Sequence, residues 1–232
     1  MKFSTSVFAF VCLFFAVTIS SHAFNNGKKP RKRKKAKKVR AYKLNSSVKD
    51  FKLINSVDGK MVALSNPEYA SAKGFILIFI SNSCPTTQLY TERLIALQEK
   101  YAHKGYPVIA INPYNSVFHP KENLNSASKI AARKQFNFPY LVNGHKVAQK
   151  FGAVKTPQVF VLQRSGKRLK IRYIGAIDNK PRLPKYHNTK YTERAVNQLI
   201  GGRKVHRKVT RPLGTRIDYY TPAKSDELIS RK

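Results

Sequence analysis

Residues 75–87 read FILIFISNSCPTT and carry the most informative pattern for the fold of this chain. Residues 75–80 are an uninterrupted apolar run, which is typical of a strand buried on both faces. Residues 86–104 follow with apolar side chains at helical spacing, and Gly105 stands where a helix would stop. Cys84 is therefore expected between the end of a central strand and the start of a helix.

The rest of the chain alternates between strand and helix patterns. Residues 107–111 predict a second buried strand, which the helical crossover makes a parallel neighbour of the first. Two strands around a short Gly-containing loop predict a hairpin, at residues 159–162 and 169–174. Further helices are expected at residues 125–135, 145–151 and 192–200. This order predicts an α/β domain of three layers with a mixed central sheet.

The position of Cys84 favours a reactive thiol. Ligands of open α/β sheets bind beyond the carboxyl ends of the strands, which is where Cys84 is expected. Pro85 suits the first turn of a helix, because the N–H that it lacks would have no partner there. The positive end of the helix dipole would then lower the thiol pKa from about 8.5 into the range of about 3.5–7.5. The alternative interpretation is a small buried packing residue.

Several ordered motifs together resemble the redoxin branch of the thioredoxin-like superfamily, the alkyl hydroperoxide reductase and thiol-specific antioxidant-like proteins. The likeness spans residues 48–214 and includes Cys84-Pro85-Thr86-Thr87 and Thr156-Pro157. The other matching motifs are residues 75–80, 108–113, 138–141, 153–160 and 175–179. The resemblance implies a thioredoxin-like fold, an active-site cysteine at Cys84, and a cis bond between Thr156 and Pro157 opposite it.

Both positions where a second thiol would be expected lack a cysteine. Thioredoxins carry Cys-x-x-Cys, but the second position here is Thr87, whose hydroxyl can hydrogen-bond a thiolate and cannot resolve a mixed disulfide. Relatives in this branch also tend to have a cysteine after a glycine near the C-terminus, whereas Gly214 is followed here by Thr215.

Peroxiredoxins are the nearest precedent with one cysteine. They resemble this site in Cys-Pro-Thr and in Ser81, three residues before the cysteine, but their proline seven residues before it is Leu77 here. His119 and His145 are candidate bases, yet nothing in the sequence places them near Cys84. Surface positions are the simpler interpretation of both histidines.

We therefore expect a thiol oxidoreductase with a single catalytic cysteine, Cys84, acting on a disulfide-containing protein or a peroxide. Thr156 and Pro157 would position the substrate, Thr87 would support the thiolate, and an external thiol would act as reductant. No cofactor is expected, and the sequence holds no metal-ligand spacing. The competing function is a non-catalytic thioredoxin-fold protein that binds acidic partners or polyanions.

The first 23 residues predict export. A basic second residue precedes the almost wholly apolar residues 7–18, and Ser21-His22-Ala23 resembles a cleavage site. Twelve apolar residues span about 18 Å as a helix, short of the hydrocarbon core of about 30 Å. Cleavage after Ala23 would remove Cys12 and leave Cys84 alone in a periplasmic or secreted protein, so no internal disulfide is expected.

The charge is strongly one-sided, with 45 Lys and Arg against 11 Asp and Glu and a net charge of +34. Residues 24–43 hold 11 basic and no acidic residues, which predicts a disordered arm. We expect this arm to contact a polyanion or an anionic membrane surface weakly. No specific nucleic acid is expected, because no recognition motif appears. For the remaining body, a solvated charged surface is the preferred interpretation.

The 232 residues have room for one ordinary domain and additional segments, and the hydrophobic fraction of 42% excludes a wholly disordered chain. The expected order is a signal peptide at residues 1–23, the basic arm at residues 24–43, a redoxin domain at residues 44–202, and a basic C-terminal extension at residues 203–232.

Overall fold

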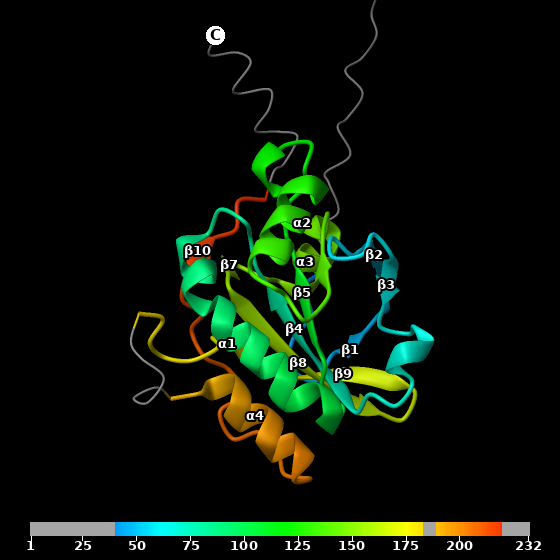
Figure 1. Cartoon of the computed structure of the whole chain (residues 1–232). Coiled ribbons are helices and arrows are strands. Elements are labelled where there is room, and N and C mark those ends of the chain that lie inside the picture. The colour runs from blue at the N-terminus through cyan, green and yellow to red at the C-terminus, as the bar shows by residue number, and fades with distance from the viewer. Residues whose placement is uncertain (1–39, 183–188, 220–232) are drawn as a thin grey trace, which may run out of the picture. The chain divides into compact units, whose positions relative to one another are not determined.

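A six-stranded mixed sheet forms the centre of this computed structural model, which describes residues 40–182 and 189–219 (Figure 1). Its strand order is β1-β9-β8-β4-β5-β6. The strands β4, β5 and β6 run parallel, whereas β8, β9 and β1 join by antiparallel pairing. Their bounds are β1 Ser47–Val48, β4 Gly74–Phe79, β5 Val108–Ile111, β6 Tyr140–Leu141, β8 Gln158–Ser165 and β9 Arg168–Gly175.

Helices and loops cover both faces of this sheet. The helices α1 (Pro85–Tyr101) and α4 (Tyr191–Ile200) pack on one face, and α2 (Leu124–Arg133) adds Ala127 to the same apolar cluster. The helix α3 (His145–Phe151) packs on the opposite face, together with the hairpin of β2 (Lys52–Ile54) and β3 (Met61–Ala63). The predicted three-layer α/β architecture with a mixed sheet is confirmed.

The apolar run of β4 supplies both cores. Its side chains alternate, so that Ile76 and Ile78 enter the cluster under α1 and α4, while Leu77 and Phe79 enter the cluster on the α3 side. All four residues are fully buried. An unbroken apolar strand is stable in this position because neither face meets water.

The long predicted elements are confirmed within a few residues. The helix α1 begins at Pro85 and is followed by a 3-10 turn at Ala102–Lys104, which ends at Gly105 with a left-handed φ of 84°. The predicted hairpin is β8 and β9, with Gly166 in its loop. The hairpin of β2 and β3 and four strands of two residues each were not predicted; these four are β1, β6, β7 (Lys155–Thr156) and β10 (Thr215–Arg216).

The folded domain extends past both predicted boundaries. At its start, the ring of Tyr42 lies 5.4 Å from that of Phe151, and its N–H donates to the carbonyl of Lys150. At its end, Val205 and Ile217 are buried in the two cores. Residues 40–43 of the predicted arm and residues 203–219 of the predicted extension thus belong to the domain. The predicted signal peptide, residues 24–39 and residues 220–232 lie outside the described residues.

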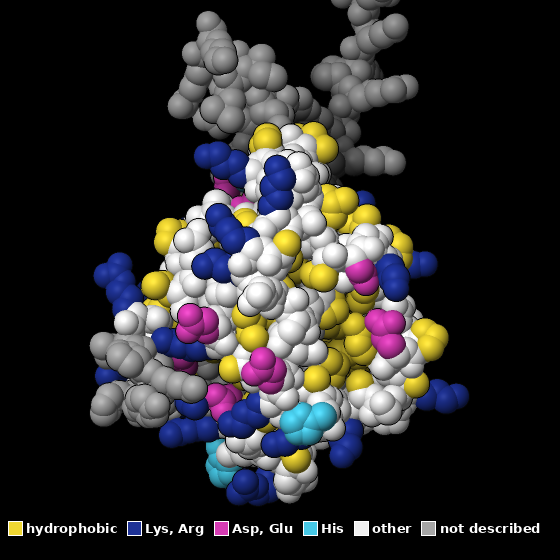
Figure 2. Space-filling model, viewed as in Figure 1, with side chains coloured by type: hydrophobic (Ala, Val, Ile, Leu, Met, Phe, Trp, Pro, Cys, Tyr) yellow, Lys and Arg dark blue, Asp and Glu magenta, His cyan; other side chains and the backbone are white. Residues whose placement is uncertain are grey.

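Charged side chains are dispersed over the described face that Figure 2 presents. Lys and Arg are spread across it with fewer Asp and Glu between them, and they do not gather in one patch there. Among the residues that the structure describes, no helix is long and apolar enough to cross a membrane.

Candidate active site

Cys84 is the N-cap residue of α1 and has an extended backbone, with φ −81° and ψ 113°. Its sulfur accepts a hydrogen bond from the backbone N–H of Thr87 at 3.4 Å. Pro85 occupies the first turn, where a missing N–H leaves nothing unsatisfied. The sulfur therefore faces the positive end of the helix, as the sequence predicted.

Thr87 contacts the sulfur through a different atom from the one expected. The sequence suggested its hydroxyl, but the contact is made by its backbone N–H, since an N-cap side chain is reached by the amide three residues on. The Thr87 hydroxyl is buried and has no hydrogen-bond partner among the described residues.

The end of β7, just before β8 begins, lies next to Cys84. The bond between Thr156 and Pro157 is cis, as predicted. The thiol lies 3.0 Å from the backbone carbonyl of Thr156 and can donate its hydrogen to it. The structure thus brings together Cys84, Thr156 and Thr87, which the sequence had singled out from two distant segments.

A segment near the C-terminus closes the site. The strand β10 pairs antiparallel with β7, placing Thr215 opposite Thr156. The hydroxyl of Thr215 lies 3.2 Å from the sulfur of Cys84, which is only 1% exposed. We call residues 214–219 the C-terminal cover.

The cover has no clear signal in the sequence. Ile217 and Tyr219 alternate with the charged residues Arg216 and Asp218, but this alternation is too short to define a strand. In the sequence, Thr215 was notable only because relatives tend to have a cysteine there. In the structure, its hydroxyl contacts the sulfur of Cys84.

The surroundings of Cys84 stabilise its ionised form. Burial raises the pKa of the thiol, but the polar groups of Thr215, Thr156 and Thr87 lower it further, from 9.0 to about 7. Once the proton is lost, the hydroxyl of Thr215 can turn and donate to the sulfur. A substantial fraction of thiolate near neutral pH follows.

A buried carboxylate holds the loop that precedes Cys84. Glu122 is 2% exposed and accepts hydrogen bonds from the backbone N–H groups of Asn82, at 2.8 Å, and Ser83, at 3.1 Å. The Ser83 hydroxyl and the Asn112 amide donate to the same carboxylate, at 2.5 and 2.7 Å. No local sequence pattern marks this residue, because its partners lie 39 to 40 positions upstream and 10 positions upstream.

The two histidines lie elsewhere. His119 and His145 are partly exposed, and they line a cavity of about 130 Å³ together with Tyr114 and Tyr219. Burial and the charge of Lys146 lower the pKa of His145. Within the described chain, the hydrogen bonds of the Cys84 sulfur go only to threonines, so neither histidine acts on it directly.

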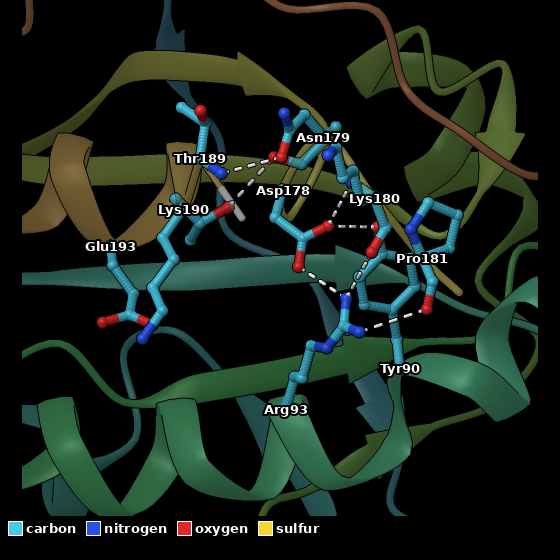
Figure 3. A network of polar contacts seen from close by, with 11 residues as sticks. Tyr90, Arg93, Asp178, Asn179, Lys180, Pro181, Thr189, Lys190 and Glu193 are labelled. Carbon is cyan, nitrogen blue, oxygen red and sulfur yellow. Dashed lines mark hydrogen bonds and ion pairs between the residues drawn. The ribbon is translucent and has the colours of Figure 1, made fainter. Parts of the chain in front are cut away.

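A second polar network ties α1 to the loop after β9 (Figure 3). Asp178 accepts from the Tyr90 hydroxyl at 2.7 Å and from the Arg93 guanidinium at 2.6 Å. Arg93 also donates to the carbonyls of Lys180 and Pro181. A cavity of about 260 Å³ lies beside the network, but its charges pair with one another, as in Lys100 with Glu193. We interpret this network as structural.

No group of three or more His, Cys, Asp or Glu side chains that could bind a metal is present in residues 40–182 and 189–219. The chemistry of the site therefore has to be argued from its own side chains.

A thiol at the N-terminus of a helix, opposite a cis proline and beyond the end of a central strand, defines the class of thioredoxin-like redox proteins. The sequence profile of the AhpC/TSA family matches residues 44–174, and the chain belongs to this family. A search of curated proteins found no match.

Solved structures agree with this fold. A hypothetical protein from Sinorhizobium meliloti 1021 is 28% identical, with a TM-score of 0.68 over 78% of this chain and 97% of that one. An uncharacterized conserved protein from Geobacillus kaustophilus is 27% identical, with a TM-score of 0.68 over 77% and 93%. The C-terminal domain of a putative thiol-disulfide oxidoreductase from Bacteroides thetaiotaomicron shares 14% identity and a TM-score of 0.50 over 72% and 99%, which shows the fold alone.

Proposed function

We propose that the protein is a thiol oxidoreductase that works with one catalytic cysteine, Cys84. The observation that carries this proposal is the thiol at the start of α1, with a pKa of about 7 and polar contacts to Thr87, Thr156 and Thr215. An ordinary cysteine is mostly protonated at neutral pH and reacts slowly, because the thiolate is the nucleophile.

In the proposed reaction, the thiolate of Cys84 attacks one sulfur of a substrate disulfide. The substrate S–S bond breaks, a mixed disulfide with Cys84 forms, and the other substrate sulfur leaves as a thiolate that takes up a proton. An external thiol then attacks the mixed disulfide, since the second position of the motif is Thr87. A second molecule of the external thiol then reacts with the disulfide formed in that step. The two external thiols leave together as one disulfide, and Cys84 is free again.

The residues around the sulfur have separate tasks in this proposal. The N–H of Thr87 and the helix dipole stabilise the thiolate. Thr156 and Pro157 position the substrate beside it, because the Thr156 backbone lies within 3.0 Å of the sulfur. Neither step needs a cofactor.

Peroxide reduction is the second candidate, and the match to the AhpC/TSA family favours it. The thiolate would attack one peroxide oxygen, the O–O bond would break, and an alcohol or water would leave. The resulting sulfenic acid would be reduced by two equivalents of an external thiol, releasing water.

We also propose that the protein is exported and that its basic arm contacts anionic surfaces weakly. The pattern of residues 1–23 supports export, and the 11 basic residues of positions 24–43 support the contact. Cleavage after Ala23 would leave Cys84 as the only cysteine, consistent with reduction by an external thiol.

The test compares the full chain with its Cys84→Ser variant, using hydroxyethyl disulfide or cumene hydroperoxide as substrate and dithiothreitol as the external thiol. We expect the variant to lose about 100-fold or more of both the disulfide and the peroxide turnover. Cys12→Ser is the matched control and should keep full activity.

Mass spectrometry of the protein without reductant separates the two reactions, because a mixed disulfide and a sulfenic acid add different masses to Cys84. Full turnover in Cys84→Ser would refute the mechanism, and no turnover in either protein would favour the non-catalytic binding protein.

A further inference from the structure

The C-terminal cover blocks the approach of a protein substrate to Cys84. The sulfur is 1% exposed, although both residues of β10 are themselves exposed. A disulfide has to reach the thiolate in line with its own S–S bond for exchange to occur. The cover must therefore leave its place before the proposed function can operate on a protein.

The cover is short and is anchored beyond the sulfur. The N–H of Ile217 donates to the carbonyl of Val154 at 3.0 Å, and its side chain is buried in the core on the α3 side. The hydroxyl of Tyr219 donates to the carbonyl of Ala153 at 2.7 Å. Loss of these contacts would free the two residues of β10 from β7 and leave the six-stranded sheet intact.

Displacement of the cover would expose an edge that binds extended backbone. Within the described residues, β7 pairs only with β10, so its polar backbone groups would become available for another strand. Thr156 on this edge already contacts the sulfur through its backbone carbonyl, so a strand bound there lies next to Cys84.

The cover itself shows which extended segment fits. The side chain opposite Thr156 reaches the sulfur, since the Thr215 hydroxyl is 3.2 Å from it. The preceding position has no room for a side chain, because a Cβ on Gly214 would lie 2.0 Å from the carbonyl oxygen of Thr156. The position two residues after Thr215 is Ile217, which is 4% exposed.

We infer that the C-terminal cover is a built-in stand-in for the substrate, and that an extended segment of a disulfide-bonded protein replaces it on β7. This inference rests on the proposed function and specifies its substrate. The reacting cysteine of the substrate occupies the position of Thr215, a glycine precedes it, and an apolar residue follows two positions later.

In this complex, Cys84 exchanges its bond partner with the disulfide of the bound segment. The Cys84 thiolate forms a bond to the sulfur at the position of Thr215, the substrate S–S bond breaks, and the distal sulfur leaves as a thiolate. One external thiol then attacks the Cys84 sulfur and releases the segment as a free thiol, which leaves the external thiol disulfide-bonded to Cys84. A second external thiol breaks that bond, the two external thiols leave as one disulfide, and the cover can return to β7 beside the free Cys84.

The first experiment measures alkylation of Cys84 by iodoacetamide in the full chain, with the modified residue identified by peptide mapping. Ile217→Ala should react about tenfold faster than the unmodified chain, because it weakens the anchor of the cover. Tyr219→Phe removes one hydrogen bond and should react about threefold faster. Leu199→Ala is the matched control, since it truncates a buried residue of α4 in the other core and should leave the rate unchanged.

The second experiment tests the register with peptides in the Ile217→Ala chain. The probe is Leu-Gly-Cys-Arg-Ile-Asp-Tyr carrying nitrothiobenzoate as a mixed disulfide, and the released nitrothiobenzoate anion is followed by its absorbance. Replacement of the glycine by alanine, or of the isoleucine by serine, should each slow the release about tenfold or more.

Three results would overturn the inference. Leu199→Ala could accelerate alkylation as much as Ile217→Ala, which would indicate general unfolding. The three peptides could react at equal rates, which would show that the residues before and after the peptide cysteine are not recognised in the proposed register. A concentration-dependent dimer of Ile217→Ala would make a second copy the occupant of β7. The proposed function fails separately, if Cys84 in Ile217→Ala is alkylated rapidly but exchanges with none of the peptides.

Discussion

At the scale of single residues, the reactivity of Cys84 depends on the few groups that touch its sulfur. Burial opposes ionisation, and the side chains of Thr215 and Thr156, together with the backbone N–H groups of Thr215 and Thr87, favour it more strongly, so the thiol pKa falls to about 7. Thr215 comes from the cover, which means that the groups that seal the sulfur also help to ionise it. When the cover leaves, the N–H of Thr87 and the helix dipole remain to stabilise the thiolate.

The first prediction concerns the pH dependence of this thiol. Alkylation of Cys84 should follow a titration curve with a midpoint near pH 7, falling about tenfold per pH unit below it, because only the thiolate reacts. Thr215→Val keeps the shape of the side chain and removes the hydroxyl, so its midpoint should move upward. Stopped-flow alkylation across pH 5 to 9 measures both curves, spanning the range of about two units around the midpoint. A midpoint in the unmodified chain at the value of a free thiol, about 8.5, would contradict the lowered pKa.

At the scale of secondary-structure elements, α1 connects the site to the rest of the domain. Cys84 caps its N-terminus, and its second and third turns carry Tyr90 and Arg93, which bind Asp178 in the loop after β9 (Figure 3). Asp178 is 2% exposed, so removing its carboxylate would leave a buried hydroxyl without its acceptor.

The second prediction follows from this network. Asp178→Ala should lower the free energy of unfolding by about 2–4 kcal/mol, as expected for a buried charged hydrogen-bond acceptor. Chemical denaturation monitored by circular dichroism measures the change. Glu92→Ala, on the exposed side of the same helix, is the control and should stay within about 0.5 kcal/mol of the unmodified chain. If both substitutions lowered the free energy of unfolding equally, the network would contribute no more to stability than an exposed position of the same helix.

The elements also show what could be predicted from the sequence and why. The strand β4 and the helix α1 were predictable because their apolar patterns continue long enough to define a period. The strands β7 and β10 have two residues each, too few to show one, and they exist only because each pairs with the other. Cys84 and Thr156 were found through motifs, whereas Glu122 and Thr215 act through partners far away in the sequence. No local pattern marks such long-range contacts.

At the scale of the whole molecule, the excess of positive charge is the dominant property. The net charge of +34 includes the 11 basic residues of positions 24–43. Because Tyr42 packs on Phe151, the last residues of this stretch belong to the domain, and a test of the arm has to leave them unchanged.

The third prediction concerns export and the arm. The chain recovered outside an exporting host cell should begin at Phe24, as Edman sequencing would show. Replacing the nine Lys and Arg of residues 28–38 by serine should weaken its binding to heparin and reduce the dependence of that binding on salt, since fewer counterions are released. The control replaces the five Lys and Arg of residues 203–211 by serine, which removes positive charge from the domain and leaves the arm unchanged. Unchanged salt dependence in the first variant would exclude the arm as the contact.

The enclosure of Cys84 also determines how long the protein keeps its activity. Cysteine that is oxidised beyond sulfenic acid, to the sulfinic or sulfonic form, is generally lost for exchange chemistry. A sulfur that is 1% exposed meets few stray oxidants while the molecule is idle. Damage should therefore accumulate with the number of catalytic cycles and much less with elapsed time.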